Sequence, residues 1–171
     1  MWDYGGIGIT RQGGESLWRF SLALYARPGV PAALLGLQDR AGCDVNLILF
    51  ALWLGARAHA LDAPWLAVAV AAIAPLNTAI VHPLRRLRRE LKGAVESDLQ
   101  SLRGRILNLE LAAERQAQQR LAATVADRPA GSATTRIALA ESNLAVCLGE
   151  EASSPEANVL RQAVAALMRA A

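Results

Sequence analysis

The sequence predicts an all-α protein, with a compact N-terminal helical bundle followed by a long amphipathic helix and C-terminal helices. Apolar side chains recur at helical spacings of three and four residues along most of the 171 residues. Proline, glycine and helix-capping aspartate interrupt these runs at short intervals, and no segment alternates like a β-strand. Because 53% of the residues are hydrophobic and 19% are charged, the composition excludes a disordered chain.

The chain begins with a glycine-rich segment that precedes the first two predicted helices. Residues 1–14 show no periodicity, so we expect a flexible arm. A helix is expected over 16–27, because its apolar residues keep helical spacing, and Pro28 with Gly29 ends it. A second helix follows over 31–42.

Two aspartates mark the starts of the next two helices. Asp44 is well placed as the N-cap of the third helix, and Asp62 has the same position before the fourth. The fourth helix must bend or break at Pro75 and before Pro83, because proline lacks the backbone donor. We assign these segments to a helical core domain, residues 15–94.

The run 65–81 resembles a short membrane span. It is 17 residues long and uncharged, and basic residues follow it. It is also rich in alanine and contains Pro75 and Asn77, which are unusual for a span of this length. We therefore expect it to be buried against the first and third helices. A membrane span and a peripheral membrane contact are alternatives that we do not favour.

The second half of the chain differs in charge. Residues 82–129 carry 10 basic and 6 acidic side chains, whereas residues 1–81 carry 5 of each. The basic residues that stand closest together are Arg85, Arg86, Arg88, Arg89 and Lys92. On a helix they lie opposite a leucine side, so this basic face could contact acidic lipid, RNA or an acidic partner, or only solvent, which we favour. Nucleic acid is not favoured, because every aromatic residue precedes residue 66.

A row of apolar residues predicts a long amphipathic helix over 95–121. The row steps by three and four residues through Leu99, Leu102, Ile106 and Leu109. We expect this partner seam to be covered by the two C-terminal helices, 136–148 and 156–169, in an antiparallel hairpin, or else by a second copy. Residues 95–171 thus form a helical extension.

The polar residues of the core gather near the turn between the second and third helices. The candidate ligand or metal residues are Gln38, Asp39, Asp44, Asn46 and Trp53. Their carboxylates and amides could bind a divalent cation or a small polar ligand. The interpretation that we favour is structural, with Asp44 capping a helix and Asp39 paired with Arg40 or Arg57.

Motifs for catalysis are absent from the sequence. His59 and His82 stand 23 positions apart without metal-binding spacing, and no serine lies in a nucleophile motif. Cys43 and Cys147 form no C-x-x-C pair, so we expect buried reduced thiols and a cytoplasmic protein. We predict no catalytic residue and no cofactor.

Two stretches carry a family resemblance. LWRFSLALYARPGV (17–30) and LQDRAGCDVNLILFALWLG (37–55) resemble an uncharacterised, mainly proteobacterial family known as domain of unknown function 2390. The resemblance extends, with decreasing clarity, to HPLRRLRREL (82–91). It implies a small, cytoplasmic helical protein with no assigned activity and no catalytic residues to carry over.

We therefore predict a noncatalytic bacterial interaction or adaptor protein that binds a protein partner, or itself, through residues 95–121. The alternative is a small-ligand or divalent-metal binding protein, or an enzyme, with a polar site around residues 38–46.

Overall fold

A computed structural model describes residues 8–125 and 136–170, which fold into helices with no strand among them. The all-α prediction is therefore confirmed. The elements, in chain order, are α1 (Gly8–Tyr25), α2 (Val30–Ala41), α3 (Val45–Ala56), α4 (Ala63–Leu76), the π-helical turn η1 (Asn77–Val81), α5 (His82–Glu90), the 3-10 turn η2 (Leu91–Gly93), α6 (Ser97–Ala123), α7 (Arg136–Leu148), the 3-10 turn η3 (Gly149–Ser153) and α8 (Pro155–Arg169).

The first helix begins earlier than the sequence predicts. Residues 8–14 were expected in a flexible arm, but α1 starts at Gly8, and residues 1–7 lie outside the described part of the chain. Gly14 is buried against α6, and a Cβ atom there would stand 2.7 Å from Cγ of Gln119. The glycines therefore serve close helix contact rather than flexibility.

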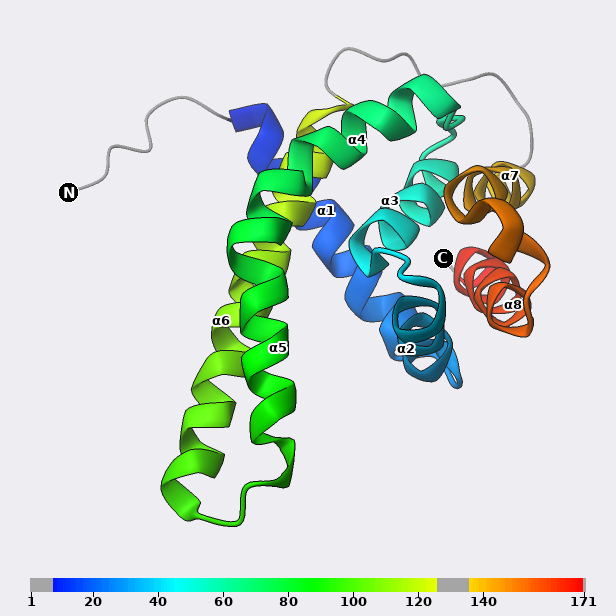
Figure 1. The fold of residues 1–171 in the computed structure, drawn as a ribbon. Helices are drawn as coiled ribbons and strands as arrows, with labels where there is room; N and C mark the ends of the chain where they lie inside the picture. The colour runs from blue at the N-terminus through cyan, green and yellow to red at the C-terminus, as the bar shows by residue number, and fades with distance from the viewer. Residues whose placement is uncertain (1–7, 126–135, 171) are drawn as a thin grey trace.

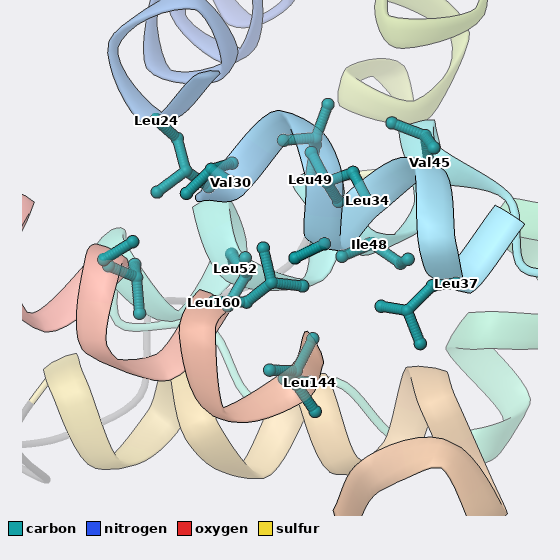
Figure 2. Close-up of a cluster of buried hydrophobic side chains, with 14 of the residues drawn as sticks. Leu24, Val30, Leu34, Leu37, Val45, Ile48, Leu49, Leu52, Leu144 and Leu160 are labelled. Carbon is teal, nitrogen blue, oxygen red and sulfur yellow. The ribbon is translucent and has the colours of Figure 1, made fainter. Parts of the chain in front are cut away.

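The main core brings together α2, α3, α7 and α8, with the end of α1 (Figure 1). Figure 2 shows its leucines converging, among them Leu34, Leu37, Leu49, Leu52, Leu144 and Leu160. α7 packs along α3, and α8 packs along α2. The two C-terminal helices of the predicted extension therefore pack back on the N-terminal helices and share one core with them.

The side chain of Asn143 forms hydrogen bonds with backbone groups of α3 and of the loop between α3 and α4. Its Nδ2 group donates to the carbonyls of Ala51 (3.1 Å) and His59 (2.9 Å), and its Oδ1 atom accepts from the N–H of Leu61 (2.7 Å). Asn143 is almost fully buried, so these bonds satisfy backbone groups that would otherwise lose water without replacement.

A second core joins α1, α3, α4 and the C-terminal half of α6. Its largest fully buried side chains are Trp65 and Phe50, whose rings meet edge to face at 6.1 Å between centroids. α6 presents small residues to this core, with Ala113 and Ala117 in one stripe that ends at Leu121. Small side chains let α6 lie close to its neighbours.

The N-terminal half of α6 pairs with α5 in a hairpin that stands away from the rest of the molecule (Figure 1). The predicted hairpin with the C-terminal helices is therefore wrong. The predicted seam is also only partly packed: Ile106 is buried and Leu99 is half-buried, whereas Leu102 and Leu109 are exposed. The buried stripe instead passes through Glu110, because α5 supplies its ionic partners.

Helices α4 and α5 are continuous through η1, so the prolines do not break the chain of helical turns. The N–H of His82 donates to the carbonyl of Asn77. This hydrogen bond joins residues five positions apart, so the helix is wider between Pro75 and Pro83. Figure 1 shows α4 and α5 pointing in different directions on either side of this turn.

Only one side of α4 packs on the core. Trp65, Ala69 and Ile73 form the inner stripe, and the opposite side is exposed. The helix Ala63–Gly93 is long and apolar enough to cross a membrane, and 33% of its most apolar window is buried. The prediction that residues 65–81 are buried against α1 and α3 is therefore wrong for most of the segment.

The crossing of α3 over α7 requires a glycine. A Cβ atom on Gly55 would lie 2.3 Å from the backbone of Ala140. We expect Gly55→Ala to push the helices apart and lower the free energy of unfolding by about 1–3 kcal/mol. Gly104→Ala is the matched control, because no atom lies within 4 Å of that Cβ position, and alanine there should stabilise α6 by up to about 1 kcal/mol. Urea unfolding measures both changes, and equal effects would contradict the close crossing.

Candidate functional site

A cavity of about 530 Å³ lies between the α2–α3 turn and α5. It brings together two groups that were separate in the sequence, namely most of the predicted polar turn and much of the basic face. The turn contributes Gln38, Asp39, Gly42, Cys43 and Asp44, and the helix contributes His82, Arg85, Arg86, Arg89 and Glu90. The cavity therefore has both cationic and anionic walls.

Asp44 lies on the side of the cavity that is formed by the α2–α3 turn. Its Oδ1 atom accepts the N–H groups of Asn46 (2.8 Å) and Leu47 (3.2 Å), so the N-cap predicted from the sequence is present. Its Oδ2 atom accepts from Nδ2 of Asn77 (2.6 Å) in η1. One carboxylate thus caps α3 and ties it to the π-helical turn.

The π-helical turn sets the register of α5. Such a turn holds more residues than an α-helical turn, so it rotates every side chain that follows. His82, Arg85 and Arg89 lie along the cavity as a result. Asn77 itself is buried, and its Oδ1 atom has no hydrogen-bond partner among the described residues.

Two arginines of α5 bind glutamates of α6, of which Glu110 is buried and Glu114 is half-buried. Arg85 donates from Nε to Glu110 (3.0 Å) and from Nη2 to Glu114 (2.7 Å). Arg88 donates to both oxygens of Glu110. Glu110 is 3% exposed, so these pairs compensate a carboxylate that has lost its water.

The two glutamates differ in their pKa shifts. Burial alone would raise the pKa of Glu110, but the hydrogen bonds and charges of Arg88 and Arg85 outweigh it and hold that pKa below 4.5. Burial raises the pKa of Glu114 above 4.5, although Arg85 opposes the shift. Glu110 is therefore the carboxylate that the arginines keep ionised most strongly.

Ion pairs close the outer rim of the cavity. Arg89 binds Asp39, whose Oδ1 atom also accepts from Nε2 of Gln38 (3.4 Å). The Gln38 amide and the Arg89 guanidinium lower the pKa of Asp39. The predicted pairing of Asp39 with Arg40 or Arg57 is wrong, because α5 folds back over the turn.

Arg40 points to the C-terminal part of the chain instead. It pairs with Glu151 (2.9 Å) and Glu156 (3.2 Å). Arg86 lies on the rim as well, 73% exposed, and its ion pair with Glu90 spans 4.0 Å.

Two predicted site residues lie elsewhere. Asn46 is buried in a polar chain across the core, where its Oδ1 atom accepts from Gln118 Nε2 (3.0 Å) and the Ser21 hydroxyl donates to Gln118 Oε1 (3.2 Å). Trp53 is buried in the second core, and the Arg57 guanidinium stacks 5.1 Å from its ring centroid. Both residues support the fold and do not line the cavity.

The other candidate residues either lie outside the cavity or are unreactive thiols. Lys92 is exposed in η2, and the seam leucines lie on the hairpin. Burial raises the pKa of Cys43 and raises that of Cys147 to about 12, so both remain thiols at neutral pH. The described residues contain no group of three His, Cys, Asp or Glu side chains that could hold a metal ion.

Sequence reasoning missed His82, Glu110 and Glu114. The two glutamates are four residues apart on α6, opposite a basic helix of the same hairpin, and this pattern is the signal that could have paired them. Both glutamates lie off the apolar row Leu99, Leu102, Ile106 and Leu109, so that row gave no indication that they contact α5.

Comparison with known proteins identifies one family model. The model described as "Protein of unknown function (DUF2390)" matches residues 16–121, which extends from α1 through nearly all of α6. No curated protein and no solved structure matches the chain. The matched region contains every residue that lines the cavity.

The role of Glu110 is testable by its pH dependence. Because its pKa is lowered on folding, its stabilising contribution is present above pH 4.5 and is lost as the pH falls through the folded-state value. We expect Glu110→Gln to lower the free energy of unfolding by about 1–3 kcal/mol at neutral pH. The difference from wild type should shrink below pH 4.5. Urea unfolding at several pH values measures it.

Glu90→Gln is the matched control, because Glu90 is 63% exposed and its ion pair is long. Its free energy of unfolding should stay near the wild-type value. An equal loss in both variants, or a Glu110→Gln deficit that persists in acid, would show that Glu110 is not the carboxylate that joins the hairpin.

Proposed function

The chain belongs to the family of proteins of unknown function DUF2390, and from this premise we propose that it is a noncatalytic interaction protein of the bacterial cytoplasm. The docking element is the α5–α6 hairpin. The observation that carries the proposal is the pair of exposed leucines Leu102 and Leu109, which lie seven residues apart on this projecting element.

The leucines of α6 lie on two sides. Leu102 and Leu109 are seven residues apart, so they share one side of the helix, and they are 45% and 59% exposed. Leu107 and Leu111 are four residues apart and share another side. Large apolar side chains that cluster in water favour contact with a partner, because burying each one fully is worth about 1.5–3 kcal/mol.

The hairpin is also held rigidly enough to present such a surface. Glu110 is bound by both Arg85 and Arg88, so α5 cannot rotate on α6 without exposing a buried charge. A surface that is ordered before binding loses less conformational entropy on association. The partner that fits Leu102 and Leu109 is a protein helix with an apolar stripe, either from another protein or from a second copy.

The docking prediction is tested by Leu102→Asp combined with Leu109→Asp. The variant should lose the partner that tagged wild-type protein retains in cells after crosslinking, or lose the dimer seen by light scattering. Its melting temperature should change little, because both positions are exposed.

Leu107→Asp combined with Leu111→Asp is the matched control. It adds the same charge to another side of the same helix and should keep the partner. A wild-type protein that is monomeric and retains no partner, or a partner retained equally by all three proteins, would contradict the proposal.

A second candidate function is the binding of a small anion in the cavity. Arg86 makes no hydrogen bond to a described residue, and Arg89 uses only its Nη2 group, so several N–H donors are free at the rim. Asp44 in contrast already accepts three hydrogen bonds, which favours an anion over a metal cation.

Titration calorimetry with inorganic phosphate and with citrate tests this candidate. The wild type should bind one of them, and Arg86→Gln combined with Arg89→Gln should weaken binding by about tenfold or more. Arg19→Gln with Arg105→Gln, two exposed positions away from the cavity, should bind like wild type. No heat with either anion would remove this candidate.

A further inference from the structure

Arg85 belongs both to the cavity and to the cluster of charges between α5 and α6. Its side chain is 16% exposed and is one of those that line the cavity. It also donates from Nε to Glu110 and from Nη2 to Glu114. Its Nη1 group makes no hydrogen bond to a described residue. Because a guanidinium carries five N–H donors, Arg85 retains donors for a ligand in the cavity.

The two glutamates depend on Arg85 to different degrees. Glu110 accepts hydrogen bonds from Arg88 as well as from Arg85. The side chain of Glu114 is bonded only to Nη2 of Arg85 among the described residues, and it is the more exposed of the two. If Arg85 turned toward a ligand, Glu110 would still be paired with Arg88. Glu114 would lose its ionic partner.

Two more guanidinium groups with free donors line the same cavity. Arg86 makes no hydrogen bond to a described residue, and Arg89 uses only its Nη2 group. Together with Arg85 they lie within residues 85–89 of α5. Three guanidinium groups on one wall favour a ligand that has several acceptor oxygens and more than one negative charge.

We infer that Arg85 is the third cationic ligand of a doubly charged oxyanion in the cavity, and that Glu114 competes with this anion for Arg85. The anion draws N–H groups of Arg85 away from Glu114, and Glu114 takes up a proton when it loses them. The inference rests on the anion-binding candidate proposed above and adds the regulation of that site.

The surroundings of Glu114 favour this proton uptake. Burial raises its pKa, and the negative charges of Glu110 and Asp44 add to the shift, whereas Arg85 opposes it. An anion that engages Arg85 weakens the opposing interaction and adds negative charge, so the pKa of Glu114 rises further. By linkage, a lower pH must then strengthen the binding of the anion.

The other groups near Glu114 keep their charge state. Burial and the charge of Glu114 raise the pKa of Tyr25 to about 12, so its phenol stays neutral. The hydrogen bonds that Arg88 donates to Glu110 raise the pKa of Arg88, so it stays cationic. Glu114 is therefore the group of this cluster that can exchange a proton with the anion in mildly acidic solution.

Titration calorimetry of the full-length protein with sulfate tests the inference, because sulfate stays doubly charged in neutral and mildly acidic solution. The affinity of the wild type should rise by about fivefold or more between about pH 7 and about pH 5. Glu114→Gln should bind sulfate about fivefold or more tightly than wild type at about pH 7, because a neutral amide holds Arg85 less strongly. Its affinity should also change less with pH. His82, Asp39 and Glu90 line the cavity too, but they remain in this variant.

Glu96→Gln is the matched control. Glu96 is exposed at the start of α6 and makes no ion pair with a described residue, so the variant removes the same charge from the same hairpin and should bind like wild type. Circular dichroism establishes that each variant is folded. If Glu114→Gln unfolds, His82→Gln replaces it: sulfate binding at about pH 6 should still take up a proton, measured from the heats in two buffers of different ionisation enthalpy.

The possible failures are distinguishable. Equal sulfate affinity of wild type and Glu114→Gln, equal tightening in Glu114→Gln and Glu96→Gln, or sulfate binding without proton uptake in His82→Gln would overturn the inference and leave the anion-binding candidate intact. Sulfate that binds neither wild type nor Glu114→Gln would also overturn it. If phosphate and citrate fail to bind as well, the anion-binding candidate is removed together with the inference.

Discussion

The Asp44 carboxylate joins the elements on which the position of the cavity depends. It accepts two backbone N–H groups at the start of α3 and the Asn77 amide from η1. An N-cap of this kind contributes about 0.5–2 kcal/mol, and a hydrogen bond to a charged acceptor contributes about 1.5–3 kcal/mol. The same group thus starts the most buried helix and determines where α4 turns into α5.

The Glu110 cluster extends this arrangement into the hairpin. Asn77 places the π-helical turn, the turn sets the register of α5, and that register lets Arg85 and Arg88 reach a glutamate on α6. Because the carboxylate is buried, the cost of separating the pair is high and the hairpin has one favoured register. Polar contacts therefore specify the half of the molecule that has little apolar core.

The proposed docking surface on the hairpin follows from this division. The apolar core covers nearly all of α3 and only one side of α4, and it does not cover the leucines at positions 102 and 109 of α6. These two uncovered surfaces lie on either side of η1, on helices that point in different directions (Figure 1). The proposed protein partner binds the hairpin, while the cavity lies beside the bend.

The local sequence pattern was sufficient to predict most of the helices and the N-cap role of Asp44, because a cap and a helical repeat involve residues within one turn of each other. The local pattern did not predict that the segment before Gly14 is helical, because its glycines serve a contact with α6. It also did not predict the ionic partner of Asp39, because Arg89 is 50 residues away. Residues of the predicted polar turn and of the basic stretch 85–92 meet in one cavity, although Arg85 and Arg88 also pair with α6, and this meeting depends on a π-helical turn that no local signal announced.

The amino-acid sequence by itself determined which segments are helical, where α3 and α4 start and which side chains prefer to be buried. The tertiary structure decided which helix covers which side: α5 took the place next to α6 because Glu110 is paired there, and α7 and α8 covered α2 and α3 instead. The physical reason is that the hydrophobic effect is not directional, so an apolar row shows that it needs a partner without indicating which one. Directional contacts between residues far apart in the chain made that choice.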